Sequence, residues 1–271
     1  MESPDPSPMF TCNPADYNKC SPVQLLWARE LIAKLDLLGF EHVIDIGCGD
    51  GKVTAAIAST VPKGTITGID SSPEMIGFAQ QHFPGTRYPN LTFIQMDARH
   101  LTFFEEFDLV FSNATLHWLS DHRPVLEGIE RCLVKGGRVV LQMGGKGNAD
   151  QIFNVLGVML DNPRWRNYFT NFSFTYGFFG TTEYTQLLVD AGLVPVRVEL
   201  IPKDMAYPTR DDFAGWIRTT WLPWLSRLPE SEKRVFIEGL IDEYLATYPV
   251  DPDGVIHIGM MRLEVEAKKG V

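Results

Sequence analysis

The sequence lacks the features of a secreted, zinc-binding or membrane-spanning protein. Its four cysteines, Cys12, Cys20, Cys48 and Cys132, form no Cys-x-x-Cys pair, so neither a zinc site nor a disulfide framework is indicated. No apolar run approaches the roughly 20 residues that cross a bilayer. The proline-rich first residues lack the basic-then-apolar order of a secretory signal. We therefore expect a cytoplasmic protein with no membrane partner.

Positive charge is also scarce. Lys and Arg number 24 against 34 Asp and Glu, which gives a formal net charge of −10. Proteins that bind nucleic acid normally present a basic face, so we expect a small-molecule partner and no nucleic acid. The 271 residues, 45% of them hydrophobic, suffice for one large core with a modest appended subdomain. Composition leaves both a monomer and a homodimer open.

One stretch has the order of a nucleotide-binding turn. Residues 43–51 read Val-Ile-Asp-Ile-Gly-Cys-Gly-Asp-Gly, a short buried strand followed by glycine at alternate positions, and a helical pattern begins at Lys52. Glycine lets the backbone approach a ligand, and the helix N-terminus offers free N–H donors. A dinucleotide fingerprint needs glycine at position 52, and Asp45 and Asp50 would repel a pyrophosphate. The loop therefore favours a cationic, phosphate-free ligand.

Two further predicted strands also end on an acid. Residues 65–70 and 91–97 alternate or run apolar and close with Asp70 and Asp97. Asp70 lies close to the offset of about 20 residues at which such folds place a carboxylate on ribose hydroxyls. The alternative is that Asp70 only caps the next helix. With Asp45, the explanation that strand-end acids are mere turn formers has to be invoked three times.

The segment from Asp45 to Gly51, Asp-Ile-Gly-Cys-Gly-Asp-Gly, resembles the first motif of the class I methyltransferases that use S-adenosyl-L-methionine. Tyr17 to Gln24 and the Thr-Thr-Trp-Leu-Pro-Trp run around Trp221 resemble the branch that includes trans-aconitate methyltransferase. The resemblance implies a Rossmann-like methyltransferase fold: α/β, doubly wound, with a mostly parallel seven-stranded sheet and helical, aromatic cap insertions. It implies S-adenosyl-L-methionine as cofactor, with these binding residues: Tyr17, Gln24, Asp45, Gly47, Cys48, Gly49, Asp70, Ser71, Met75, Asp97, Ala98, Asn113 and Ala114.

In that family the loop after the fourth strand, here residues 113–118, faces the methyl acceptor. His117 is the titratable residue in it and has two possible roles, a general base or part of the pocket wall with Trp118. We favour the wall, because imidazole and aromatic rings commonly line apolar pockets. His117 and His122 stand five apart and no Cys or acid completes a metal set, so we expect no metal.

The chain is expected to form one methyltransferase domain, residues 13–271, behind a disordered tail of residues 1–12. Within the domain we expect an N-terminal lid helix in residues 13–37 and two cap insertions, 144–180 and 203–250. Three later strands are expected at residues 138–142, 194–201 and 255–267, the last of them antiparallel.

These patterns predict a methyltransferase acting on a small molecule, with O-methylation of a small carboxylic acid as the preferred reaction. Arg164, Arg166 and Arg218 lie among aromatic residues and could clamp a carboxylate, with His117 and Trp118 beside it. Methylation of an amine or hydroxyl, and a non-catalytic S-adenosylmethionine-binding regulator, remain alternatives. A carboxylate is ionised above about pH 5, so no general base is required.

Overall fold

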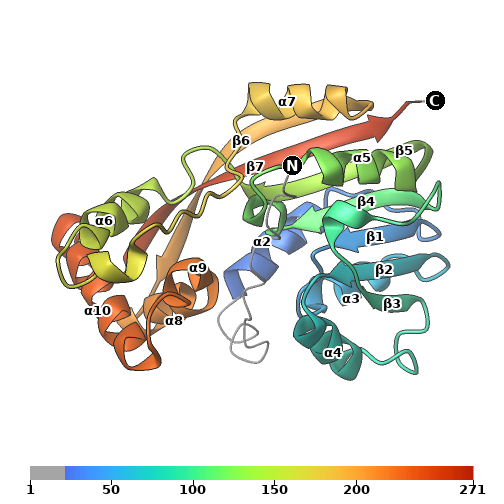
Figure 1. Ribbon diagram of the computed structural model, residues 1–271. Coiled ribbons are helices and arrows are strands. Elements are labelled where there is room, and N and C mark those ends of the chain that lie inside the picture. The colour runs from blue at the N-terminus through green and yellow to red at the C-terminus, as the bar shows by residue number, and fades with distance from the viewer. Residues whose placement is uncertain (1–21, 271) are drawn as a thin grey trace.

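A mixed seven-stranded sheet forms the centre of the computed structural model, which describes residues 22–270, with side chains described from Trp27 onward. The strands lie in the order β3-β2-β1-β4-β5-β7-β6 (Figure 1). Neighbours among β1 to β5 run parallel, whereas β7 runs antiparallel to both β5 and β6, which confirms the predicted fold class and the antiparallel last strand. The strands are β1 His42–Ile46, β2 Thr65–Asp70, β3 Leu91–Gln95, β4 Phe107–Asn113, β5 Leu133–Gly144, β6 Leu193–Tyr207 and β7 Ile256–Lys269.

Helices cover both faces of this sheet. The strands are buried on both sides, so their side chains alternate between two cores. In β4, for example, Leu109 and Phe111 face one core and Val110 the other. The helices of the first face are α2 Pro22–Ile32, α3 Lys52–Ala58 and α4 Pro73–His82. Those of the second face are α5 Arg123–Cys132 and α7 Thr181–Asp190.

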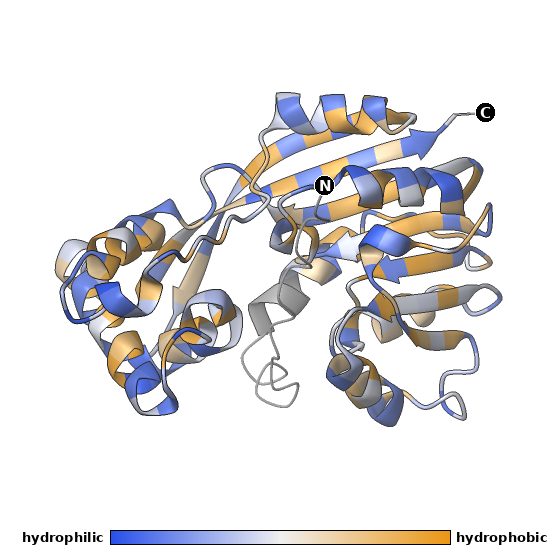
Figure 2. Ribbon diagram, in the orientation of Figure 1, coloured by the Kyte–Doolittle hydropathy of each residue, from blue (hydrophilic) through white to orange (hydrophobic). Residues whose placement is uncertain are grey.

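A group of helices, here called the cap, stands beside the sheet with a hydrophobic core of its own. The outer parts of β6 and β7 reach out of the sheet and pack under these helices, contributing Met205, Tyr207 and Ile258 to that core (Figure 1). Most apolar residues of the cap helices are buried in this core, whereas Val158 and Val235 are exposed; Figure 2 shows how hydropathy varies along these helices. The cap contains α6 Asp150–Leu160, η3 Arg166–Phe169, α8 Arg210–Thr220, α9 Leu222–Leu225 and α10 Glu230–Thr247.

Strand β6 is longer than the sequence predicts. It was expected to end at Ile201, but it pairs with β7 as far as Tyr207 opposite Ile256. The extra residues alternate, with Met205 and Tyr207 buried in the cap core, and an edge strand tolerates Pro202 because one side of it needs no partner. Within the part of the chain that the structure describes, no helix is long and apolar enough to cross a membrane.

Candidate active site

The glycine loop follows β1 and is shaped by positive φ angles. Gly47, Gly49 and Gly51 have φ of 76°, 53° and 82°, a region that side chains strongly disfavour. A side chain at Gly47 would collide with Thr115, so this glycine is also needed for packing. At Gly49 an added Cβ would meet nothing within 4 Å. The backbone of Gly49 therefore borders open space in which a ligand can lie against it.

Two carboxylates lie under and beside this loop. Asp45 is buried and accepts a hydrogen bond from Thr54 Oγ1 at 2.7 Å; burial raises the pKa of its carboxyl to about 7. Asp70 accepts one hydrogen bond from the Gly49 N–H at 3.0 Å and another from the Ser72 N–H at 2.9 Å. The cap of α4 is Ser72, whose Oγ accepts from the Met75 N–H, so Asp70 does not serve as that cap.

Asp97 follows β3, but it has a partner that the sequence did not indicate. Its carboxylate binds the Arg99 guanidinium, with Nε at 3.1 Å from each oxygen and Nη2 at 2.6 Å from Oδ2. These bonds lower the pKa of the Asp97 carboxyl. The carboxylate also caps the 3-10 helix η1 (Ala98–His100) through the Arg99 N–H. An adenine amine would have to share Asp97 with this ion pair.

The loop after β4 lies between the glycine loop and an adjoining pocket. Thr115 Oγ1 donates to the Gly47 carbonyl at 3.0 Å, which fixes the two loops together. Asn113 Oδ1 is buried and has no hydrogen-bond partner among the described residues. A buried acceptor without a donor is costly, and a ligand carrying an amino group would satisfy it. Ala114, the next residue, already lines the adjoining pocket.

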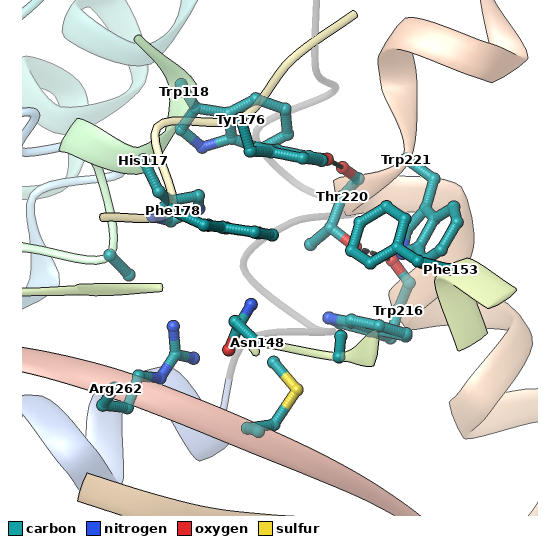
Figure 3. A pocket seen from close by; sticks show the side chains of 13 residues that line it. His117, Trp118, Asn148, Phe153, Tyr176, Phe178, Trp216, Thr220, Trp221 and Arg262 are labelled. Carbon is teal, nitrogen blue, oxygen red and sulfur yellow. Dashed lines mark hydrogen bonds between the residues drawn. The ribbon is translucent and has the colours of Figure 1, made fainter. Parts of the chain in front are cut away.

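This pocket lies between the sheet and the cap (Figure 3). Its volume is about 80 Å³. Rings from several separate segments form most of the wall, and a few polar groups lie among them. The lining residues are Ala114, His117, Trp118, Asn148, Ala149, Phe153, Tyr176, Phe178, Trp216, Thr220, Trp221, Met260 and Arg262.

His117 is held as a neutral hydrogen-bond donor. Burial and the nearby Arg262 charge lower the pKa of its imidazole to about 3. Its Nδ1 accepts from the Gly144 N–H at 3.4 Å, so the proton of the neutral ring is on Nε2. The Gly177 N–H donates to the His117 carbonyl at 2.9 Å and ties the loop of Tyr176 and Phe178 to it. This geometry favours the predicted wall role over a base.

Among the described residues that line the pocket, the cation is Arg262, which the sequence interpretation did not select. It lies on β7 opposite Gly144, at the last pair between β5 and β7, and so at the junction of sheet and cap. The residue is only 4% exposed. Its guanidinium stacks on the Trp27 ring of α2, 4.4 Å from the ring centroid. Since β7 alternates, a charge in phase with buried Ile258 and Met260 was the available signal.

The three arginines predicted as anion clamps do not line the pocket. Arg164 is exposed, pairs with Glu232 at 3.2 Å and stacks on Trp165. Arg166 is exposed and donates to a backbone carbonyl of its own segment, and Arg218 is exposed on α8. Aromatic residues are abundant throughout the cap, so an aromatic neighbourhood in sequence did not distinguish its surface from the pocket.

The remaining predicted residues divide by location. Cys48 and Met75 are buried beside the glycine loop and in α4, Ser71 is exposed after β2, and Ala98 begins η1. Tyr17 lies outside the described residues. Gln24 lies on α2, but its side chain is outside the described part.

Comparison with known proteins places this geometry among methyl-transferring enzymes. Residues 43–137 match the family model of a methyltransferase domain. The chain is 30% identical over 262 residues to trans-aconitate 2-methyltransferase of Escherichia coli (strain K12 / DH10B), covering 96% of this chain and 99% of that one.

Solved structures share the fold. A proposed methyltransferase of Bacillus halodurans C-125 matches with a TM-score of 0.63 and 18% identity, covering 90% of this chain and 99% of that one. The phosphoethanolamine N-methyltransferase 2 of Haemonchus contortus, in complex with S-adenosylhomocysteine, matches with a TM-score of 0.60 and 16% identity, covering 95% and 57%.

Proposed function

The chain belongs to the trans-aconitate methyltransferase family of S-adenosylmethionine-dependent enzymes, and we propose that it methylates a carboxylate oxygen of a small organic acid. The observation that carries this proposal is the pocket beside the β4 loop, in which buried Arg262 and neutral His117 are both donors. Donors without a neighbouring base suit an acceptor that is already an anion.

The cofactor supplies an electrophilic methyl group on a positively charged sulfur. For this chain we assign the ribose hydroxyls to Asp70, the amino acid end to the Gly47–Gly49 backbone and Asn113, and the adenine to the Asp97–Ala98 segment. Two features support the fit: the open space over Gly49 and the buried acceptor Asn113 Oδ1. Buried Asp45, whose carboxyl has a pKa of about 7, carries part of a negative charge beneath the loop near neutral pH, which suits a cationic ligand.

The acceptor side holds the acid and excludes water. Arg262 offers up to five N–H donors in a fixed fork that matches a carboxylate. His117 Nε2–H and the Asn148 amide add neutral donors, and the Asn148 Oδ1 is occupied by the Met261 N–H at 3.1 Å. Because a carboxylate ionises near pH 4, one of its oxygens can attack without loss of a proton. Positioning and desolvation are then the main tasks of the protein.

The test is methyl transfer to organic acids, followed by detection of S-adenosylhomocysteine and of the methyl ester. We expect Arg262→Met to lower kcat/KM by about 100-fold, since hydrogen bonds to charged groups are worth about 1.5–3 kcal/mol, while the affinity for S-adenosylmethionine stays unchanged. Arg164→Met is the matched control, because this arginine lies on the cap surface, and it should retain full activity.

Three results would count against the proposal. Methyl transfer only to amines or hydroxyls would move the reaction to another acceptor class. Cofactor binding without transfer to any acceptor would indicate a regulator. Equal losses in Arg262→Met and Arg164→Met would remove Arg262 from the binding site.

A further inference from the structure

The pocket is divided into a charged side and an apolar side, and this division indicates the shape of the acid. Figure 3 shows Arg262 and His117 on one side and Trp216, Trp221 and Phe153 on the other. His117, on the charged side, belongs to the β4 loop, where the cofactor is expected. Resting on the proposed function, we infer that the acceptor is a monocarboxylic acid with a flat apolar body, its carboxylate on Arg262 and its body among the cap rings.

Charge decides how many carboxylates the pocket can hold. Arg262 is the only lysine or arginine among the described residues that line it, whatever other contacts its guanidinium makes. His117 does not add a positive charge near neutral pH, since its pKa is about 3. A second carboxylate would therefore meet no second cation among the described lining residues, and burying an unpaired charge is strongly unfavourable. The polycarboxylate implied by the names of the curated relatives fits this lining poorly.

The apolar side offers mainly ring faces, with the indole N–H groups of Trp216 and Trp221 as neutral donors. Phe153 of α6 stacks on Trp221 with centroids 4.9 Å apart and planes 22° apart, and Trp221 meets Trp216 edge-on at 5.7 Å. The one hydroxyl of α8 at this side, Thr220 Oγ1, already donates to the Trp216 carbonyl at 2.6 Å. Flat rings in such an arrangement suit a planar, unsaturated body better than a hydrated one.

A second pair of rings supports the same shape beside the carboxylate. Tyr176 and Phe178 stack with centroids 4.8 Å apart and planes 4° apart. The Tyr176 hydroxyl points to the Thr220 carbonyl at 3.5 Å and so bridges the loop to α8. Burial raises the pKa of this phenol well above its usual value, so it remains neutral and adds no charge to the site.

The experiment compares two acids that differ only at the far end. Sorbate is a planar six-carbon dienoate with a terminal methyl group, and trans,trans-muconate has a second carboxylate in place of that methyl. With saturating cofactor we expect kcat/KM for sorbate to exceed that for muconate, and that for trans-aconitate, by about 100-fold or more.

A variant that places a cation at the apolar end should weaken the preference for the monocarboxylate. Phe153 is half-buried on α6, and Phe153→Lys should narrow the ratio of sorbate to muconate at least tenfold, whereas Phe153→Leu should leave it unchanged. Thermal unfolding and cofactor affinity verify that both variants fold. If either does not, the ratio measured with the unmodified protein decides alone.

The outcomes separate this inference from the proposed function. Faster methylation of muconate or trans-aconitate than of sorbate would overturn the monocarboxylate inference, while ester formation would still support carboxylate methylation. If no acid yields an ester although the cofactor binds, the proposed function fails and this inference fails with it.

Discussion

The surroundings of His117 predict that it does not act as a general base. With the pKa of its imidazole lowered to about 3 by burial and by Arg262, it takes up no proton between pH 6.5 and 8.5. Its Nδ1 is engaged with the Gly144 N–H, so it cannot accept a proton from the substrate without losing that bond. We expect His117→Asn to lower kcat/KM by about tenfold or less, the worth of one neutral hydrogen bond.

The pH dependence distinguishes this role from acid–base catalysis. We expect the ratio of kcat/KM between the unmodified protein and His117→Asn to stay constant from pH 6.5 to 8.5. A limb near pH 7 present in both proteins would be assigned to Asp45, whose buried carboxyl has a pKa of about 7. A limb that disappears only in His117→Asn, with a loss of several hundredfold, would instead make His117 the base for an amine or hydroxyl acceptor.

Single residues also show how far the sequence could predict the site. The acids at the ends of β1 and β2 and the glycines between them were identifiable, because a short buried strand and its loop are contiguous in sequence. Arg99 as the partner of Asp97, and Arg262 as the pocket cation, were not identified. The position of Arg262 depends on where β5 stops pairing with β7, a long-range contact that no local pattern encodes.

At the level of elements, a comparison of two glycines separates the effect of backbone strain from the effect of ligand contact when a glycine is replaced by alanine. Gly49 and Gly136 both have positive φ, 53° and 76°, and an added Cβ would meet nothing within 4 Å at either position. Alanine should therefore cost each a similar free energy of unfolding, about 1 kcal/mol. Only Gly49→Ala should weaken S-adenosylmethionine binding, because only its Cβ would enter the proposed cofactor space.

Calorimetric titration with cofactor and thermal unfolding of both variants test this prediction. Unchanged cofactor affinity in Gly49→Ala would place the ligand away from this backbone. Equal loss of affinity in Gly136→Ala, which lies in β5 between the residues paired with Phe107 and Leu109 of β4, would mean that destabilisation rather than contact explains the effect.

Trp27 of helix α2 contacts the acceptor pocket by stacking on Arg262. Trp27 is buried, and the Arg262 guanidinium lies 4.4 Å from its centroid. We expect Trp27→Ala to raise KM for the acid about 3- to 10-fold with a smaller change in kcat, since a cation–π contact of roughly 1 kcal/mol keeps the guanidinium in place. Trp27→Phe should recover most of the loss.

Leu35→Ala is a suitable control, because Leu35 is equally buried beyond the end of α2 but belongs to the sheet core. It should lower the melting temperature without changing KM. If Leu35→Ala and Trp27→Ala raise KM alike, then global stability, and not the stacked ring, governs the position of Arg262.

At the scale of the whole molecule, the doubly wound sheet was predictable and the division into sheet and cap was predicted only in outline. Each parallel strand carries an apolar run or an alternating apolar pattern, so its approximate bounds follow from the sequence. The cap helices could be recognised as insertions, but β6 was expected to end before them. Only its pairing with β7, as far as Tyr207 and Ile256, shows that two strands run through both parts.

Strand β7 passes from the sheet core into the cap core. Shortening a buried side chain should therefore affect the sheet or the cap, depending on where in β7 that side chain lies. Ile258 is buried in the cap core and Val265 in the sheet core. Replacing a buried Ile by Ala lowers the free energy of unfolding by about 2–5 kcal/mol, and the structure around the substituted side chain opens first.

We expect Ile258→Ala to speed hydrogen exchange in residues 150–160 and 210–247 and to raise KM for the acid, with cofactor affinity unchanged. Val265→Ala should instead speed exchange in residues 107–113 and 133–144. Uniform acceleration by both variants would show that sheet and cap unfold as one cooperative unit, and the acceptor pocket could not then open independently of the cofactor site.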